Sequence, residues 1–159
     1  SAIFDIGANA TAMVVIREGR VVYTREHAFG GRSLVDDVQR RYGLSQDEAQ
    51  AAIRANSLPE SYAEEVLPGF RSGVAVQLGR LLQYFYAGSE FNRVDQIIVC
   101  GGTAAMSGLA EAISAEIGVP AHVGNPLADM GRASRVPARA VEEGTSMMIA
   151  CGLALRSFD

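Results

Sequence analysis

Residues that bind zinc are scarce in this sequence of 159 residues. It contains two cysteines, Cys100 and Cys151, far apart in apolar segments, and two histidines, His27 and His122. Neither a CxxC pair nor the Cys/His spacing of a structural zinc site is present, so no zinc site is expected. Both cysteines are expected to be free thiols in a reducing cytoplasm, since unpaired cysteine is commonly buried.

The sequence also lacks the long apolar and cationic segments of membrane proteins and nucleic-acid-binding proteins. No apolar run approaches the roughly 20 residues of a membrane helix, and no charged segment followed by an apolar stretch marks a secretory signal. The formal net charge is −4, which disfavours nucleic acid and anionic lipid as partners. Two familiar phosphate-binding sequences, GxxxxGK[ST] and GxGxxG after the first strand, are absent, which excludes a P-loop or a Rossmann fold.

What the sequence does contain begins with strands. Alternating apolar residues predict three antiparallel strands at residues 2–5, 12–18 and 20–28, joined by the turns GAN and EGR. The chain begins inside this strand pattern, so we expect it to continue a longer parent protein.

Helix signals follow these strands. Ser33 and Asp36 have the spacing of a capping box, and Gly43 marks the end of the helix that they begin. Ser45 begins a short helix, QDEAQAAIRA. A stripe of apolar residues predicts a long helix after it, which the Pro-Gly pair at residues 68–69 kinks or divides.

The last third of the chain alternates strands and helices. DQIIVCGG reads as a buried, parallel strand, SGLAEAISAEIG as a helix, PAHVGNP as a short strand, residues 128–139 as a loop, and EEGTSMMIACGLALRSF as a helix. This order predicts an α/β fold with a mixed sheet and flanking helices. We expect a core lobe of residues 1–42 and 93–159, with residues 43–92 inserted as a small helical lobe.

The segment FDIGANAT places a carboxylate, a glycine and a hydroxyl at the tip of the first hairpin. Backbone N–H groups in a glycine-containing turn can converge on an anion. Asp5 could then hold Mg²⁺ through water, and Thr11 could add its hydroxyl. Alternatively, Asp5 and Asn9 make only the hydrogen bonds of an ordinary turn. This segment alone leaves both interpretations open.

Two glycine pairs form further candidates. Gly101 and Gly102 end the apolar strand, which leaves room for a flat ligand against bare backbone, with helix N-terminal amides nearby. Gly30 and Gly31 precede a helix and can bring it close to a ligand or to the hairpin tip. At both pairs, a turn into a helix that needs glycine only for its backbone geometry explains the residues equally well.

The order of these three segments resembles the second half of the actin-like ATPase superfamily, which includes actin, sugar kinases and the division protein FtsA. There, a DxGxxxT hairpin forms the second phosphate-binding loop, and GGxxxxxG after an apolar strand forms the adenosine motif. The segments FDIGANAT, REHAFGG, QRRYGLS, VGNPLADM and ACGLALRSF are jointly similar to the PilM family of type IV pilus assembly proteins over essentially the whole chain. The resemblance implies an actin-like (ribonuclease H-like) fold whose N-terminal half lies outside this chain.

The resemblance also implies a site for ATP or ADP with magnesium. The residues it places around Mg²⁺ and the terminal phosphates are Asp5, Gly7, Asn9 and Thr11. The residues it places near the adenosine are Gly101, Gly102, Thr103 and, by a looser correspondence, Arg54. Asp5 is the expected magnesium ligand, through water. Ala8 and Asn9 stand where many relatives carry a second glycine, which loosens the expected phosphate contacts.

The function implied is an ATP-binding cytoplasmic scaffold of the type IV pilus inner-membrane platform, which serves twitching motility and adhesion. Such a protein is attached to the membrane only through partners: PilN, whose tail docks mainly on the half outside this chain, and pilus motor ATPases. Self-association is a further expectation. Hydrolysis is expected to be weak or absent, because phosphoryl transfer needs groups on several sides of the phosphate. Two alternatives remain open: an actin-fold ATPase or small-molecule kinase, and a degenerate actin-like secretion-system scaffold without a nucleotide.

Overall fold

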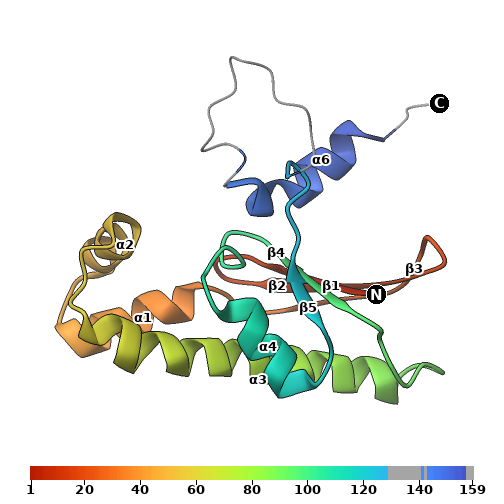
Figure 1. The fold of residues 1–159 in the computed structure, drawn as a ribbon, viewed down its shortest axis with the longest axis horizontal. Coiled ribbons are helices and arrows are strands. Elements are labelled where there is room, and N and C mark those ends of the chain that lie inside the picture. The colour runs from red at the N-terminus through yellow and green to blue at the C-terminus, as the bar shows by residue number, and fades with distance from the viewer. Residues whose placement is uncertain (129–140, 142, 157–159) are drawn as a thin grey trace.

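A mixed five-stranded sheet lies at the centre of the protein. The computed structural model describes residues 1–128, 141 and 143–156. The strands are β1 (Ala2–Ile6), β2 (Thr11–Arg17), β3 (Arg20–His27), β4 (Ile97–Cys100) and β5 (Ala121–Val123), in the spatial order β3-β2-β1-β4-β5 (Figure 1). The first three strands form an antiparallel meander, whereas β4 and β5 run parallel to β1. The predicted mixed sheet and its three N-terminal strands are therefore confirmed.

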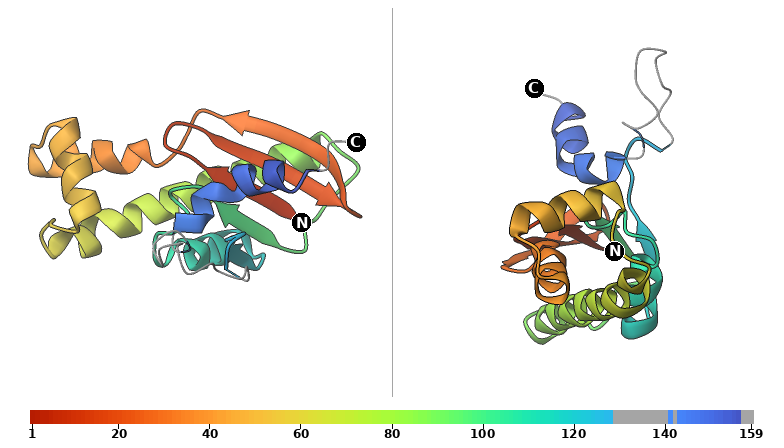
Figure 2. Two further views of the ribbon diagram at one scale, coloured as in Figure 1. Left: turned by 90° about the horizontal axis from the view of Figure 1, so that it is seen from above. Right: turned by 90° about the vertical axis from the view of Figure 1, so that its left-hand side faces the viewer.

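Helices lie on both sides of the sheet. They are α1 (Arg32–Tyr42), α2 (Gln46–Ala55), α3 (Leu67–Ala87), α4 (Leu109–Ile117) and α6 (Met148–Ala154), with a π-helical turn η1 (Tyr62–Val66) and a 3₁₀ turn η2 (Glu143–Met147). Figure 2 shows α3 and α4 on one face of the sheet and α6 on the other, while α1 and α2 extend beyond the ends of the strands. None of the helices in the described part of the chain is both long and apolar enough to cross a membrane.

The hydrophobic core lies between the sheet and α3. Phe4 and Ile6 of β1 are fully buried, and so is Leu78 of α3. Leu82 and Phe85 follow Leu78 at helical spacing and are about 1% exposed. Burying each such side chain contributes about 2 kcal/mol, so α3 is a main source of stability. Although α3 falls within the segment 43–92 expected as an inserted lobe, it lies against the sheet, and α2 is the helix that stands apart.

The two predicted helix caps have different outcomes. Ser45 begins α2 as predicted, and it also forms a capping box that was not predicted: its hydroxyl accepts the Glu48 N–H at 3.3 Å, and the Glu48 carboxylate accepts the Ser45 N–H at 2.8 Å. The prediction that Ser33 caps α1 is wrong, because α1 begins at Arg32 and has no side-chain cap. Backbone bonds to the first hairpin take the place of a cap, since the Gly31 and Arg32 N–H groups donate to the Gly7 and Ala8 carbonyls.

Two other predicted helices begin later than their sequences indicated. Pro68 occupies the first turn of α3, where its missing N–H costs nothing, and the preceding residues form η1 rather than more α-helix. Near the C-terminus, η2 precedes α6, so the predicted single helix has two parts in the described residues. Apart from residue 128, the loop predicted at 128–139 lies outside the described residues.

Candidate functional site

A cavity of about 370 Å³ opens where β1, β4 and the helices α1 and α2 meet. Its walls come from the β1–β2 tip, the first turn of α1, one face of α2 and the loop after β4. Five of the eight residues predicted around the nucleotide line this one cavity: Gly7, Asn9, Arg54, Gly102 and Thr103. The fold therefore brings together three segments that are far apart in the chain.

The β1–β2 tip presents unused backbone N–H groups. Two of its carbonyls accept hydrogen bonds: Gly7 O accepts the Gly31 N–H at 2.9 Å and the Thr103 hydroxyl at 3.4 Å, and Ala8 O accepts the Arg32 N–H at 2.8 Å. The amides of Ala8 and Asn9, in contrast, donate to no acceptor within the described residues. Backbone amides without an acceptor at a small-residue turn are suited to binding an anion.

Gly30 and Gly31 permit the close approach of α1 to this tip. A Cβ on Gly30 would lie 2.4 Å from Gly7 O and 2.6 Å from Ala8 O, both backbone atoms that cannot move aside. A Cβ on Gly31 would lie 2.4 Å from the Thr103 hydroxyl. The structure therefore agrees with one of the two interpretations of this glycine pair, namely that it lets the helix pack closely against the hairpin tip.

Asp5 and Gly101 lie side by side at the ends of β1 and β4. The Asp5 side chain is half-buried on the sheet face opposite Phe4 and Ile6. Gly101 has φ +92°, and a Cβ there would lie 2.5 Å from Asp5 Oδ1 and 2.6 Å from Ile6 O. Neither residue lines the cavity itself.

The surroundings of Asp5 bear on the predicted magnesium ion. Across residues 1–128, 141 and 143–156, the Asp5 carboxylate has no hydrogen bond or ion pair, and no group of three or more His, Cys, Asp or Glu residues gathers. Because Mg²⁺ keeps several waters and commonly takes one or two carboxylates plus phosphate oxygens, a single free carboxylate fits that ion.

Thr11 is placed differently from the other tip residues. It is fully buried, and its hydroxyl donates to the Phe29 carbonyl at 2.7 Å. This bond ties β2 to the segment that leads into α1. The Thr11 side chain does not line the cavity. Its role in this structure is to hold the tip in place.

Two polar residues of the cavity were missed from the sequence, Gln50 and Arg32. Gln50 lies four residues before Arg54, hence on the same face of α2, and this spacing was the signal that would have found it. Arg32 lines the cavity from the first turn of α1. Of the described residues that line the cavity, two are arginines and none is acidic, although the chain as a whole has a net charge of −4. The cavity is therefore a local electropositive site.

The two cysteines differ in environment. Burial, and secondarily the Asp5 carboxylate, raises the pKa of Cys100 to about 12. Cys151 of α6 is half-buried. Because the thiolate is the reactive form, we predict that a maleimide at pH 8 labels Cys151 in the folded protein and leaves Cys100 unmodified. Mass spectrometry of the labelled peptides checks this; equal labelling of both in the native state would contradict it, and denatured protein should label at both.

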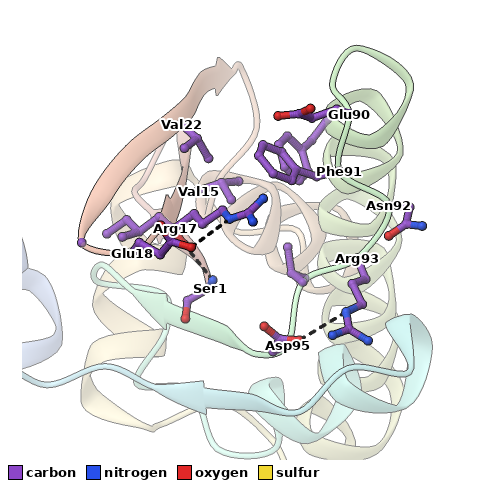
Figure 3. A pocket seen from close by; sticks show the side chains of 14 residues that line it. Ser1, Val15, Arg17, Glu18, Val22, Glu90, Phe91, Asn92, Arg93 and Asp95 are labelled. Carbon is purple, nitrogen blue, oxygen red and sulfur yellow. Dashed lines mark hydrogen bonds and ion pairs between the residues drawn. The ribbon is translucent and has the colours of Figure 1, made fainter.

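A second cavity, of about 700 Å³, lies at the opposite end of the β1–β2 hairpin. Figure 3 shows two ion pairs among its side chains, Arg17 with Glu18 and Arg93 with Asp95, each at 3.6 Å. The Arg17 guanidinium also lies 5.1 Å from the centroid of the Phe91 ring. None of the eight predicted site residues lines this cavity, and its arginines already have anionic neighbours.

Solved structures similar to this chain share the actin-like fold. A chain of a "PilM-PilN type IV pilus biogenesis complex" is 24% identical with a TM-score of 0.77; the match covers 98% of this chain and 45% of that one. EutJ, an ethanolamine utilization protein from Carboxydothermus hydrogenoformans, is 23% identical with a TM-score of 0.61, over 77% of this chain and 42% of its own. MreB5 of Spiroplasma citri bound to AMPPNP is 18% identical with a TM-score of 0.55, over 97% of this chain and 54% of its own.

These matches confirm the predicted actin-like fold, and this chain spans about half or less of the length of each of the three proteins. The family model described as type IV pilus assembly protein PilM matches residues 1–158, nearly the entire sequence. The chain therefore belongs to the PilM family of type IV pilus assembly proteins.

Proposed function

We propose that the protein binds ATP or ADP at the 370 Å³ cavity and acts as a nucleotide-binding scaffold in type IV pilus assembly. The observation that carries this proposal is the composition of the cavity wall. It combines free tip amides with two arginines and, among the described residues, no acidic side chain. The proposal draws further support from MreB5, whose structures contain AMPPNP or ADP.

In this proposal, different residues of the site bind the phosphates and the nucleoside. The amides of Ala8 and Asn9 donate to phosphate oxygens, and Asp5 holds Mg²⁺ through water. Gly7 allows the tight turn, and Thr11 fixes the tip through its bond to Phe29. The cavity residues that take the adenosine are Gly102, Thr103, Gln50 and Arg54, with Gly101 at the adjoining corner after β4.

The scaffold role concerns partners of the whole protein. PilN is the proposed membrane partner, because the structure most like this chain among those described above is a PilM–PilN complex. We place the protein in the cytoplasm, at the inner membrane through such partners, with PilN docking mainly on a region that corresponds to the part of that relative which this chain does not match. Contacts with pilus motor ATPases and self-association belong to the same proposal.

Calorimetric titration with a non-hydrolysable ATP analogue, with and without Mg²⁺, tests the nucleotide proposal. We expect saturable binding that is tighter with Mg²⁺, because the ion screens the phosphate charge from Asp5. No heat of binding at millimolar nucleotide with Mg²⁺ would contradict the proposal and favour a scaffold without a nucleotide. Steady release of phosphate above background would instead favour the ATPase or kinase alternative.

A further inference from the structure

Arg32 connects the phosphate-facing tip to the helix that forms the nucleoside side of the cavity. Its backbone N–H donates to Ala8 O of the tip at 2.8 Å. Its guanidinium donates through Nη2 to Oε1 of Gln46, the first residue of α2, at 2.9 Å. Arg32 is thus bonded to both walls of the cavity that it lines.

Helix electrostatics do not explain an arginine at this position. Arg32 is the first residue of α1, a helix with no acidic residue in its first turn and no side-chain cap. A cation there faces the positive end of the helix dipole, which is unfavourable. Arg54, the other cation of the cavity, lies in the last turn of α2, where the dipole favours it. Of the two arginines, Arg32 alone is disfavoured by the dipole of its own helix, and an anion in the cavity would offset that cost.

We propose that the Arg32 guanidinium binds the phosphate of the ligand, and that Gln46 is its hydrogen-bond acceptor when no ligand is bound. This inference rests on the proposed nucleotide function. The neutral amide oxygen of Gln46 is a weaker acceptor for a guanidinium than a phosphate oxygen. A nucleotide in the cavity therefore takes the guanidinium from Gln46, which releases the bond between α1 and α2. Arg32 thus sets the preference for nucleotide over nucleoside and couples phosphate binding to the position of α2.

This competition predicts changes of opposite sign at two neighbouring residues. Arg32→Gln should weaken binding of the ATP analogue roughly tenfold and leave adenosine binding unchanged. Arg32→Lys should restore part of the loss, because the charge remains. Gln46→Ala removes the competing acceptor and should tighten analogue binding about two- to fivefold. Gln46→Glu should weaken it, because a carboxylate holds the guanidinium more firmly.

The experiment titrates the wild-type protein and these variants with the ATP analogue and with adenosine. Arg40→Gln is the matched control: Arg40 is an exposed arginine of the same helix that does not line this cavity. Unchanged adenosine affinity shows that a variant has kept its fold. If the wild type binds the analogue but Arg32→Gln keeps its preference over adenosine, or Gln46→Ala and Gln46→Glu shift affinity alike, this inference is overturned alone. If the wild type binds neither ligand, the proposed function fails and this inference with it.

Discussion

Gly101→Ala is expected to lower the free energy of unfolding by about 3 kcal/mol, from left-handed backbone strain and overpacking together. Gly101 has φ +92°, a conformation that residues with a Cβ rarely adopt. The new Cβ would also lie 2.6 Å from the backbone oxygen of Ile6 and 2.5 Å from Asp5 Oδ1. Chemical denaturation of the variant and the wild type measures the difference.

The neighbouring glycine provides the control for this substitution. Gly102 is exposed, its φ lies outside the left-handed range, and a Cβ there would meet nothing within 4 Å. Gly102→Ala should therefore change the free energy of unfolding by no more than about 0.5 kcal/mol. Equal stabilities of the two variants would contradict the left-handed conformation and the close backbone contacts of Gly101.

Asp5→Asn is expected to abolish most of the magnesium dependence of nucleotide binding. The substitution keeps the size of the side chain but removes the one free carboxylate at the end of β1. Affinity for the ATP analogue with Mg²⁺ should fall roughly tenfold, since a bond to a charged group is lost. Without Mg²⁺ the affinity should change little or improve, because the carboxylate repels phosphate. Titrations with and without Mg²⁺ measure both.

Asp36→Asn is the matched control for this variant. Asp36 is an exposed residue of α1 that does not line the cavity, so its loss of charge should leave both affinities at the wild-type level. If Asp5→Asn retains the full magnesium effect, Asp5 does not act near the ion. If both variants lose it equally, the effect arises from overall charge rather than from the site.

The regular strands and the glycine motifs were predictable because their signals are local. The alternation in β1 and β2 reports directly which residues face the core, and Gly101 follows a continuous apolar strand. The capping box of Ser45 likewise depends on residues within one turn of helix. Where sequence neighbours make the contacts, the sequence and the structure agree.

Features that depend on contacts between distant segments could not be predicted. Ser33 had the sequence of a helix cap, yet bonds from Gly31 and Arg32 to the β1–β2 tip begin α1 instead. The Thr11 hydroxyl faces Phe29, eighteen residues away, and no local pattern indicates that partner. Arg32 was missed as a cavity residue for the same reason, because its bond to Gln46 of α2 exists only in the folded chain.

A structure of the protein with an ATP analogue and Mg²⁺ tests the central claim most directly. The account predicts phosphate oxygens at the amides of Ala8 and Asn9, with the adenosine between Gly102 and Arg54. The Arg32 guanidinium should have left Gln46 and contact a phosphate. A nucleotide bound elsewhere, such as the cavity beside Phe91, or an empty 370 Å³ cavity at saturating ligand, would contradict the account.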